Sequence, residues 1–212
     1  MNTRVVLATA ASLVAAVLVM VLSIHPSANA SASESPLERR HAATTGNPNA
    51  KVHIVEFVDP ACEGCRAFFP IVKQLMANNP ERLRLSVRLV GFHQGADFAV
   101  KALEASKLQG KFWQVLERLM ASQERWAINH RVQAELVWEQ LKAPELGLNL
   151  ERLKLDMESF GVARNVVMDL QDAKTLKVNK TPEFFVNGKS LPQFGQEHLQ
   201  RLVSDELATA YR

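Results

Sequence analysis

Apolar and polar positions along the chain repeat every two residues in some segments and about every 3.6 residues in others. Residues 51–58 are β-branched and almost continuously apolar, which is typical of a strand covered on both faces. Residues 62–77 carry apolar side chains at helical spacing. Residues 83–89 alternate, as expected of a strand with one wet face. This order predicts two parallel strands joined by a right-handed connection.

A long helical segment follows and contains all three tryptophans of the chain. We interpret them mainly as packing residues, with a peptide-binding groove as the alternative. Strand character returns only at residues 183–186, where Asn187-Gly188 favours a type I′ hairpin turn, and an amphipathic helix ends the chain. The pattern predicts one α/β domain, residues 50–95 and 178–212, with a helical insertion at residues 96–177.

The N-terminal residues have the composition of an export signal. Arg4 precedes a largely apolar run at residues 5–24, and small residues lead up to Ala30. Residues 1–30 are therefore a signal peptide or, because the apolar run is about 30 Å long as a helix, an uncleaved membrane anchor. In both cases the rest of the chain is expected to be exported. Residues 31–49 are rich in Ser, Ala, Thr, Asn and Pro and are interpreted as a linker.

Composition limits the classes of function. The chain has 212 residues and a net charge of +3, and its basic residues alternate with acids along predicted helices. This charge is too weak and too dispersed to indicate a nucleic-acid partner. His53, His130 and His198 fall in predicted regular elements. His93 is interpreted as a surface-loop histidine, with a position near the cysteines as the alternative, and we assign none of these histidines a catalytic role.

The only two cysteines, Cys62 and Cys65, are spaced C-x-x-C where the apolar strand gives way to the helix. A cysteine in the first helical turn faces unpaired N–H groups and the positive end of the helix dipole, which favour the thiolate. We expect Cys62 to attack and Cys65 to resolve. A structural disulfide or half a metal site are the alternatives, but the loop is short and no second Cys/His pair has zinc-like spacing. We expect no metal and no cofactor.

The sequence resembles the thioredoxin superfamily, and most closely its DsbA-like exported thiol:disulfide oxidoreductases. The resemblance covers residues 46–212 and rests on four features: Val55-Glu56-Phe57 before the C-x-x-C pair, Pro70, Thr181-Pro182, and the hairpin at Asn187-Gly188. It implies a thioredoxin-like fold with an inserted helical subdomain and a sheet of four or five strands. It also implies a cis bond at Thr181-Pro182 and a peptide-binding surface beside the cysteines.

The resemblance also assigns roles to residues outside the C-x-x-C pair. Glu56 occupies the position where the family buries a carboxylate beneath the disulfide, and burial would let it take the proton of Cys65. An ordinary strand-end carboxylate is the alternative. Thr181 and Pro182 would present backbone to an extended substrate, whereas a trans proline would simply begin an edge strand.

The dipeptide between the cysteines departs from the strongly oxidising DsbA proteins, which carry a histidine before the second cysteine. Here the dipeptide is Glu63-Gly64, and we expect both positions to affect redox tuning. Glu63 should raise the pKa of the Cys62 thiol and weaken its oxidising power, while Gly64 offers no charge. A solvent-facing Glu63 of little influence is equally compatible with the sequence.

These observations predict a periplasmic thiol:disulfide oxidoreductase that introduces disulfides into translocated proteins. Its partners would be unfolded exported proteins with free cysteines and a membrane redox partner, either a quinone-linked oxidase or a membrane reductant. A reductase or isomerase of the same fold is the first alternative, although residues 31–50 are too short for the dimerisation domain of known exported isomerases. A non-enzymatic peptide-binding chaperone is the second.

Overall fold

The computed structural model describes residues 35–129 and 131–212. Residues 35–212 form one compact unit of the chain. The expected signal peptide or anchor therefore lies outside the described residues. Within the described ranges, no helix is both long and apolar enough to cross a membrane.

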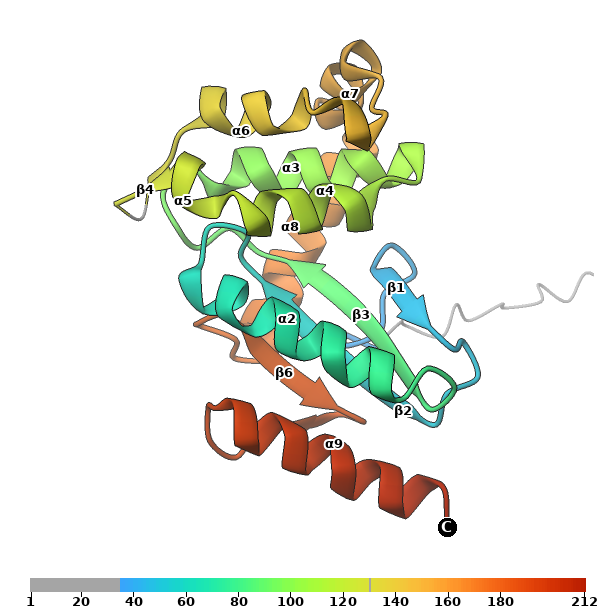
Figure 1. The fold of residues 1–212 in the computed structure, drawn as a ribbon. Coiled ribbons are helices and arrows are strands. Elements are labelled where there is room, and N and C mark those ends of the chain that lie inside the picture. The colour runs from blue at the N-terminus through green and yellow to red at the C-terminus, as the bar shows by residue number, and fades with distance from the viewer. Residues whose placement is uncertain (1–34, 130) are drawn as a thin grey trace, which may run out of the picture. The chain divides into compact units, whose positions relative to one another are not determined.

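A five-stranded sheet forms the centre of the described unit, with strand order β1-β3-β2-β6-β7 (Figure 1). Strand β2 (Val52–Val58) pairs in parallel with β3 (Leu83–Leu89), as predicted. It pairs antiparallel with β6 (Glu183–Val186) on its other side. A two-residue turn joins β6 to β7 (Lys189–Ser190), and both Asn187 and Gly188 have positive φ, as a type I′ turn requires.

The expectation of a linker at residues 31–49 is wrong for the part that the structure describes. Strand β1 (Ala43–Gly46) pairs antiparallel with β3 at the sheet edge. Two consecutive β-branched residues, Thr44 and Thr45, suit an edge strand, and the Thr44 hydroxyl hydrogen-bonds that of Ser86 at 2.8 Å. The composition of the segment concealed this, because its pairing partner lies about forty residues further along the chain.

Helices cover both faces of the sheet. Helix α2 (Glu63–Asn78) packs on one face together with α9 (Gln196–Ala210), and α8 (Phe160–Thr175) packs on the other (Figure 1). Every residue of β2 is consequently buried, in agreement with its continuous apolar pattern. Ile54 and Val58 belong to the core under α2, whereas Val55 and Phe57 belong to a second cluster on the α8 side.

Between β3 and β6 the chain is mostly helical, as predicted, with one small hairpin that the sequence pattern did not reveal. Trp126 is completely buried there, while Trp113 and Trp138 are partly buried against the core. The elements of this segment are α3 (Ala96–Ser106), a 3-10 turn (Lys107–Gln109), α4 (Phe112–Ala121), α5 (Gln123–Trp126), β4 (Ala127–Ile128), β5 (Arg131–Val132), α6 (Ala134–Leu141), a second 3-10 turn (Pro144–Leu146), α7 (Leu150–Met157) and α8.

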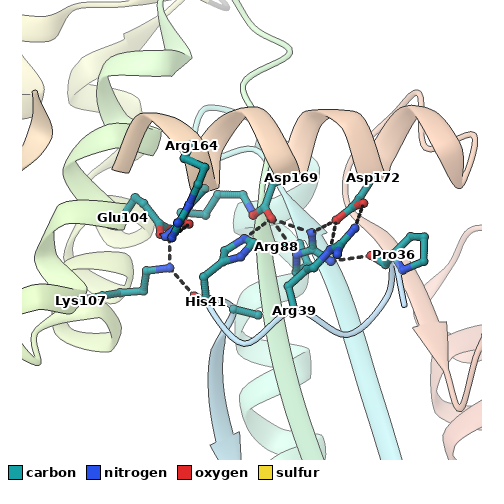
Figure 2. A network of polar contacts seen from close by, with 12 residues as sticks. Pro36, Arg39, His41, Arg88, Glu104, Lys107, Arg164, Asp169 and Asp172 are labelled. Carbon is teal, nitrogen blue, oxygen red and sulfur yellow. Dashed lines mark hydrogen bonds and ion pairs between the residues drawn. The ribbon is translucent and has the colours of Figure 1, made fainter. Parts of the chain in front are cut away.

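The expectation that one face of β3 is wet is also wrong. Arg88 on that face is fully buried, and its guanidinium bonds Asp169 at 2.7 Å and Asp172 at 2.6 Å, both on α8 (Figure 2). The N-terminal segment of residues 35–42 completes this network. Its Arg39 forms two hydrogen bonds with Asp172, and its Pro36 carbonyl accepts one from Arg88. A charged side chain lies in the interior because paired charges surround it.

Candidate active site

The two cysteines lie where the sequence placed them, at the start of α2. Cys62 is the N-cap residue and Cys65 lies in the first turn, and both thiols are free in this structure. Cys62 is 9% exposed and Cys65 only 1%. In its protonated form the Cys62 thiol donates a hydrogen bond to the Thr181 carbonyl at 3.2 Å, so the reactive loop contacts the segment before β6.

The surroundings of the two sulfur atoms separate their acidities. A hydrogen bond from the Cys65 thiol is the main cause that lowers the pKa of Cys62 to about 5. Together with bonds from the Thr181 side chain and the backbone N–H groups of Cys65 and Gly64, it outweighs the opposing effect of burial. Burial raises the pKa of Cys65 well above its usual value, and the interaction with Cys62 and the charge of Glu56 add to this. Cys62 is therefore the thiolate at neutral pH, while Cys65 keeps its proton.

Glu56 lies on β2, on the side that faces α2. Burial raises the pKa of its carboxyl group to about 8, so most of the group is protonated at neutral pH. Glu56 and Cys65 line the same cavity of about 280 Å³ between the sheet, α2 and α4. The structure thus brings together a proton donor or acceptor and the sulfur atom that must change its protonation state during exchange.

The Thr181-Pro182 peptide bond is cis, as the resemblance implied. Pro182 packs directly against the C-x-x-C loop: a Cβ atom added at Gly64 would lie 3.2 Å from Pro182 Cδ, 3.4 Å from the Thr181 carbonyl oxygen and 3.5 Å from Cys62 Sγ. The sequence suggested only an electrostatic consequence of Gly64. In the structure, the missing side chain allows the proline loop to approach the cysteines closely.

Glu63 is exposed at the first turn of α2. The sequence predicts that it raises the pKa of the Cys62 thiol, yet that pKa lies well below its usual value. The negative charge of Glu63 acts on His93, whose pKa it helps to raise. A redox role for Glu63 remains a prediction.

Asp59, directly after β2, organises the site and was missed by sequence reasoning. Its side chain is fully buried. Oδ1 accepts from Ala61 N at 2.8 Å, and Oδ2 accepts from Phe92 N at 2.7 Å and from His93 N at 2.9 Å and Nδ1 at 2.8 Å. An aspartate that directly follows a buried strand often accepts a hydrogen bond from the backbone N–H two residues later, and this sequence position is a recognisable signal for an Asx turn. Its bonds to the loop at residues 92–93 depend on tertiary structure.

The helical insertion also holds the reactive loop. Gln123 of α5 is buried, and its amide nitrogen donates to the Pro60 carbonyl at 2.8 Å and to the Cys62 carbonyl at 3.0 Å. Strand β5 holds the loop after β3, because Val132 N donates to the Gln94 carbonyl at 2.9 Å. The insertion is therefore part of the site's construction. Among the described residues, no group of three or more His, Cys, Asp or Glu side chains is arranged to hold a metal ion.

The fold and the dithiol together define a thioredoxin-like protein. The family model described as Thioredoxin matches residues 39–205, so the chain belongs to the thioredoxin family. Its α/β architecture with a helical insertion is that of the DsbA-like members.

Several solved structures share this fold. A thioredoxin-like oxidoreductase from Silicibacter pomeroyi DSS-3 is 29% identical, with a TM-score of 0.69, and the match covers 81% of this chain and 95% of that one. Oxidised BdbD from Bacillus subtilis is 22% identical, with a TM-score of 0.70 and coverages of 82% and 97%. A variant of alpha-DsbA1 from Wolbachia pipientis is 14% identical, with a TM-score of 0.69 and coverages of 82% and 94%.

Curated relatives are much longer than the matched region. The Na(+)/H(+) antiporter NhaA of Herminiimonas arsenicoxydans is 31% identical over 158 residues, which are 74% of this chain and 24% of that protein. The antiporter NhaA 1 of Mycolicibacterium gilvum is 29% identical over 161 residues, again 24% of its length. The chain thus spans about a quarter of the length of the curated relatives that it matches.

Proposed function

We propose that the protein introduces disulfides into exported proteins through a redox-active Cys62–Cys65 pair. The observation that carries the proposal is the contrast between the two thiols: the pKa of Cys62 is lowered to about 5, whereas that of Cys65 is raised. A stabilised thiolate favours the reduced form of the dithiol, which makes its disulfide a stronger oxidant. The same thiolate is a good leaving group.

The reaction begins when a substrate thiolate attacks the Cys62 sulfur of the disulfide. The bond between Cys62 and Cys65 breaks, a mixed disulfide forms, and Cys65 leaves as a thiolate. Glu56, protonated at neutral pH because burial raises its pKa to about 8, supplies the proton that Cys65 takes up. A second substrate thiolate then attacks the substrate sulfur, and Cys62 departs with the electron pair of the broken bond. The substrate is oxidised by two electrons and the enzyme dithiol is reduced.

Reoxidation reverses the proton movement at Cys65 and needs an electron acceptor. A membrane redox partner linked to quinone is the proposed acceptor, and the proposed location is the periplasm, supported by the export pattern of residues 1–30. Thr181 and Pro182 are the proposed backbone platform for the substrate. The bond between Cys62 Sγ and the Thr181 carbonyl supports this, because a substrate sulfur joined to Cys62 would lie beside that backbone.

The test is the reduction potential of the purified protein in glutathione buffers, together with oxidation of a dithiol peptide. We expect a potential clearly above the about −270 mV of thioredoxin and nearer to the about −120 mV of DsbA. Cys62→Ser and Cys65→Ser should each abolish peptide oxidation, because neither variant can form the Cys62–Cys65 disulfide. A potential at or below that of thioredoxin would assign the protein to reduction instead. Full peptide oxidation by Cys62→Ser would remove the dithiol from the mechanism, and absence of peptide oxidation and reduction by the parent would leave a peptide-binding role.

A further inference from the structure

His93 lies on the loop between β3 and α3, outside the C-x-x-C segment, and a single buried carboxylate ties it to that segment. Asp59 Oδ1 holds the N–H of Ala61, the residue before Cys62, while Oδ2 holds both the backbone and the ring of His93. The Cys62 N–H in turn donates to the Asp59 backbone carbonyl at 3.0 Å. One oxygen of the Asp59 carboxylate thus holds the turn before Cys62, and the other holds the imidazole of His93.

The insertion holds the same loop from its other side. Gln94, the residue after His93, accepts a hydrogen bond from Val132 N and bridges to Arg131 on β5. Gly95 follows with a φ of 78°, and a Cβ atom there would lie 3.2 Å from the Val132 carbonyl oxygen. The position of His93 is therefore fixed on both sides, and its side chain, 24% exposed, is only half-buried.

The charges around His93 favour its protonated form. Burial lowers the pKa of its imidazole, but the hydrogen bond and charge of Asp59, with the charges of Cys62 and Glu63, outweigh burial and raise it above the ordinary value. Arg131 is the cation on the neighbouring hairpin. Because Nδ1 donates to Asp59, Nε2 is the ring atom that gains or loses the proton.

We propose that His93 is a charge partner of the Cys62 thiolate, positioned by Asp59, and that it supplies the positive charge that the Glu63-Gly64 dipeptide does not. An imidazolium near the sulfur stabilises the thiolate, and the thiolate stabilises the imidazolium to the same extent, since the coupling is reciprocal. Reduction of the disulfide creates the thiolate, so it should also draw a proton onto His93. The inference rests on the proposed dithiol exchange, but the coupling can be measured without a substrate.

The direct test is an NMR titration of His93 in the disulfide and dithiol forms of the protein. Asp59 is present in both forms, so a difference reports on the Cys62 thiolate. We expect a lower pKa for His93 in the disulfide form and in reduced Cys62→Ser than in the reduced parent. His198 on α9 is the internal control and should titrate identically in all three. Equal titration of His93 in all three forms would overturn the proposal.

The complementary test measures the Cys62 thiolate by its ultraviolet absorbance and alkylation rate in His93→Gln, His93→Lys and the control His198→Gln. His93→Gln should lower the thiolate fraction at pH 5 by about three- to tenfold, the effect of one partly screened charge nearby. His93→Lys should restore it, and His198→Gln should match the parent. A parent-like thiolate in His93→Gln would refute the charge partnership, even where peptide oxidation by the parent upholds the proposed function. Loss of peptide oxidation in a parent whose coupling is intact would refute only the function.

Discussion

Glu56 and Asp59 are both buried acids at the end of β2, yet their surroundings assign them different tasks. Four N–H groups converge on Asp59, an environment that suits an ionised carboxylate, which only accepts hydrogen bonds. Glu56 lies against apolar side chains, where burial raises its pKa to about 8. One carboxyl group therefore holds the loop together, and the other is suited to proton transfer.

Glu56→Gln should stabilise the protein at neutral pH and slow its chemistry. A carboxyl group whose pKa rises on folding, from 4.5 to about 8, contributes full stability below pH 4.5 and loses it as the pH rises towards 8. Because Gln does not ionise, the free energy of unfolding of Glu56→Gln should exceed that of the parent by on the order of 3 kcal/mol at pH 7. Urea unfolding from pH 4 to 9 measures the gain.

The same variant cannot supply a proton to Cys65 as it leaves, so formation of the mixed disulfide from the oxidised enzyme should slow by at least about tenfold, as for loss of a general acid–base group. Glu197→Gln, an exposed glutamate on α9, is the control and should change neither property. Parallel stability curves for parent and Glu56→Gln would contradict the raised pKa. An unchanged rate of mixed-disulfide formation would contradict the proton transfer.

At the level of elements, the four-residue helix α5 supports a site to which it contributes no reactive group. Its Gln123 spans two carbonyl groups of the reactive turn, at Pro60 and Cys62. Since these carbonyls precede α2, the amide holds the backbone that positions the Cys62 sulfur. A helix far along the chain therefore determines how rigidly the first turn of α2 is presented.

Gln123→Leu should destabilise the protein by about 2 kcal/mol, because it keeps the volume but removes the amide donor from the Pro60 carbonyl and one of two donors from the Cys62 carbonyl. It should also change the alkylation rate of Cys62. Gln109→Leu is a matched control, since Gln109 makes a similar amide-to-carbonyl bond with Asn149 at an exposed place. Denaturant unfolding and thiol alkylation of both variants provide the comparison. Equal effects in the two variants would mean that Gln123 has no special relation to the site.

Much of the fold could be predicted from local pattern. The period of apolar residues identified β2, α2, β3 and β6, because each buries its own side chains along one continuous segment. The pattern also located the start of α2 at the cysteines. It could not reveal β1, because the threonines of this strand are recognisable as a strand only through their pairing with β3. Nor could it reveal the buried face of β3, because Arg88 is buried there by pairing with acids about eighty residues away.

The same limit applied to the candidate site. The proposed roles of Cys62 and Cys65 follow from their spacing at the start of the helix, and that of Glu56 follows from the family resemblance. Asp59 was missed, and for His93 a position near the cysteines was only an alternative, because their hydrogen bond joins positions 34 residues apart. Gln123 is a polar residue in a helix by every local criterion, and only its contacts identify it as a support of the cysteine turn.

At the level of the whole molecule, the network of Arg88, Asp169, Asp172 and Arg39 joins the N-terminal segment, the sheet and α8 (Figure 2). Its acids also bond the backbone, since Leu89 N donates to Asp169 at 2.8 Å. Burial raises the pKa of Asp172, but its bonds with Arg39 and Arg88 outweigh burial and lower it overall. The N-terminal segment is therefore a structural part of the domain.

Arg39→Met should cost about 3 kcal/mol at pH 7, because it leaves Asp172 with one partner fewer in the interior. An acid whose pKa is lowered on folding stabilises the protein above its unfolded value of 3.8 and loses this contribution as the pH falls through its folded value. The gap between parent and variant should thus narrow below pH 3.8. Urea unfolding across pH 2 to 7 tests this.

The control for this experiment is Lys142→Met, which breaks an exposed ion pair with Glu139. Surface pairs contribute about 0–1 kcal/mol, so this variant should unfold almost like the parent at every pH. A cost for Arg39→Met as small as that of the control would mean that residues 35–42 are dispensable. If the cost of Arg39→Met stayed constant with pH, this cost would not arise from the titration of Asp172.

The close approach of Pro182 to Gly64 limits how this protein can diversify. A side chain at residue 64 would require Pro182 to give by a few tenths of an ångström, whereas residue 63 is exposed. Natural variation or laboratory selection at the dipeptide is therefore less constrained at residue 63 than at residue 64. Variants with an altered reduction potential are therefore best sought at residue 63 and in the loops around Cys62. Libraries that randomise both positions will also select on how well the proline loop accommodates a side chain at residue 64.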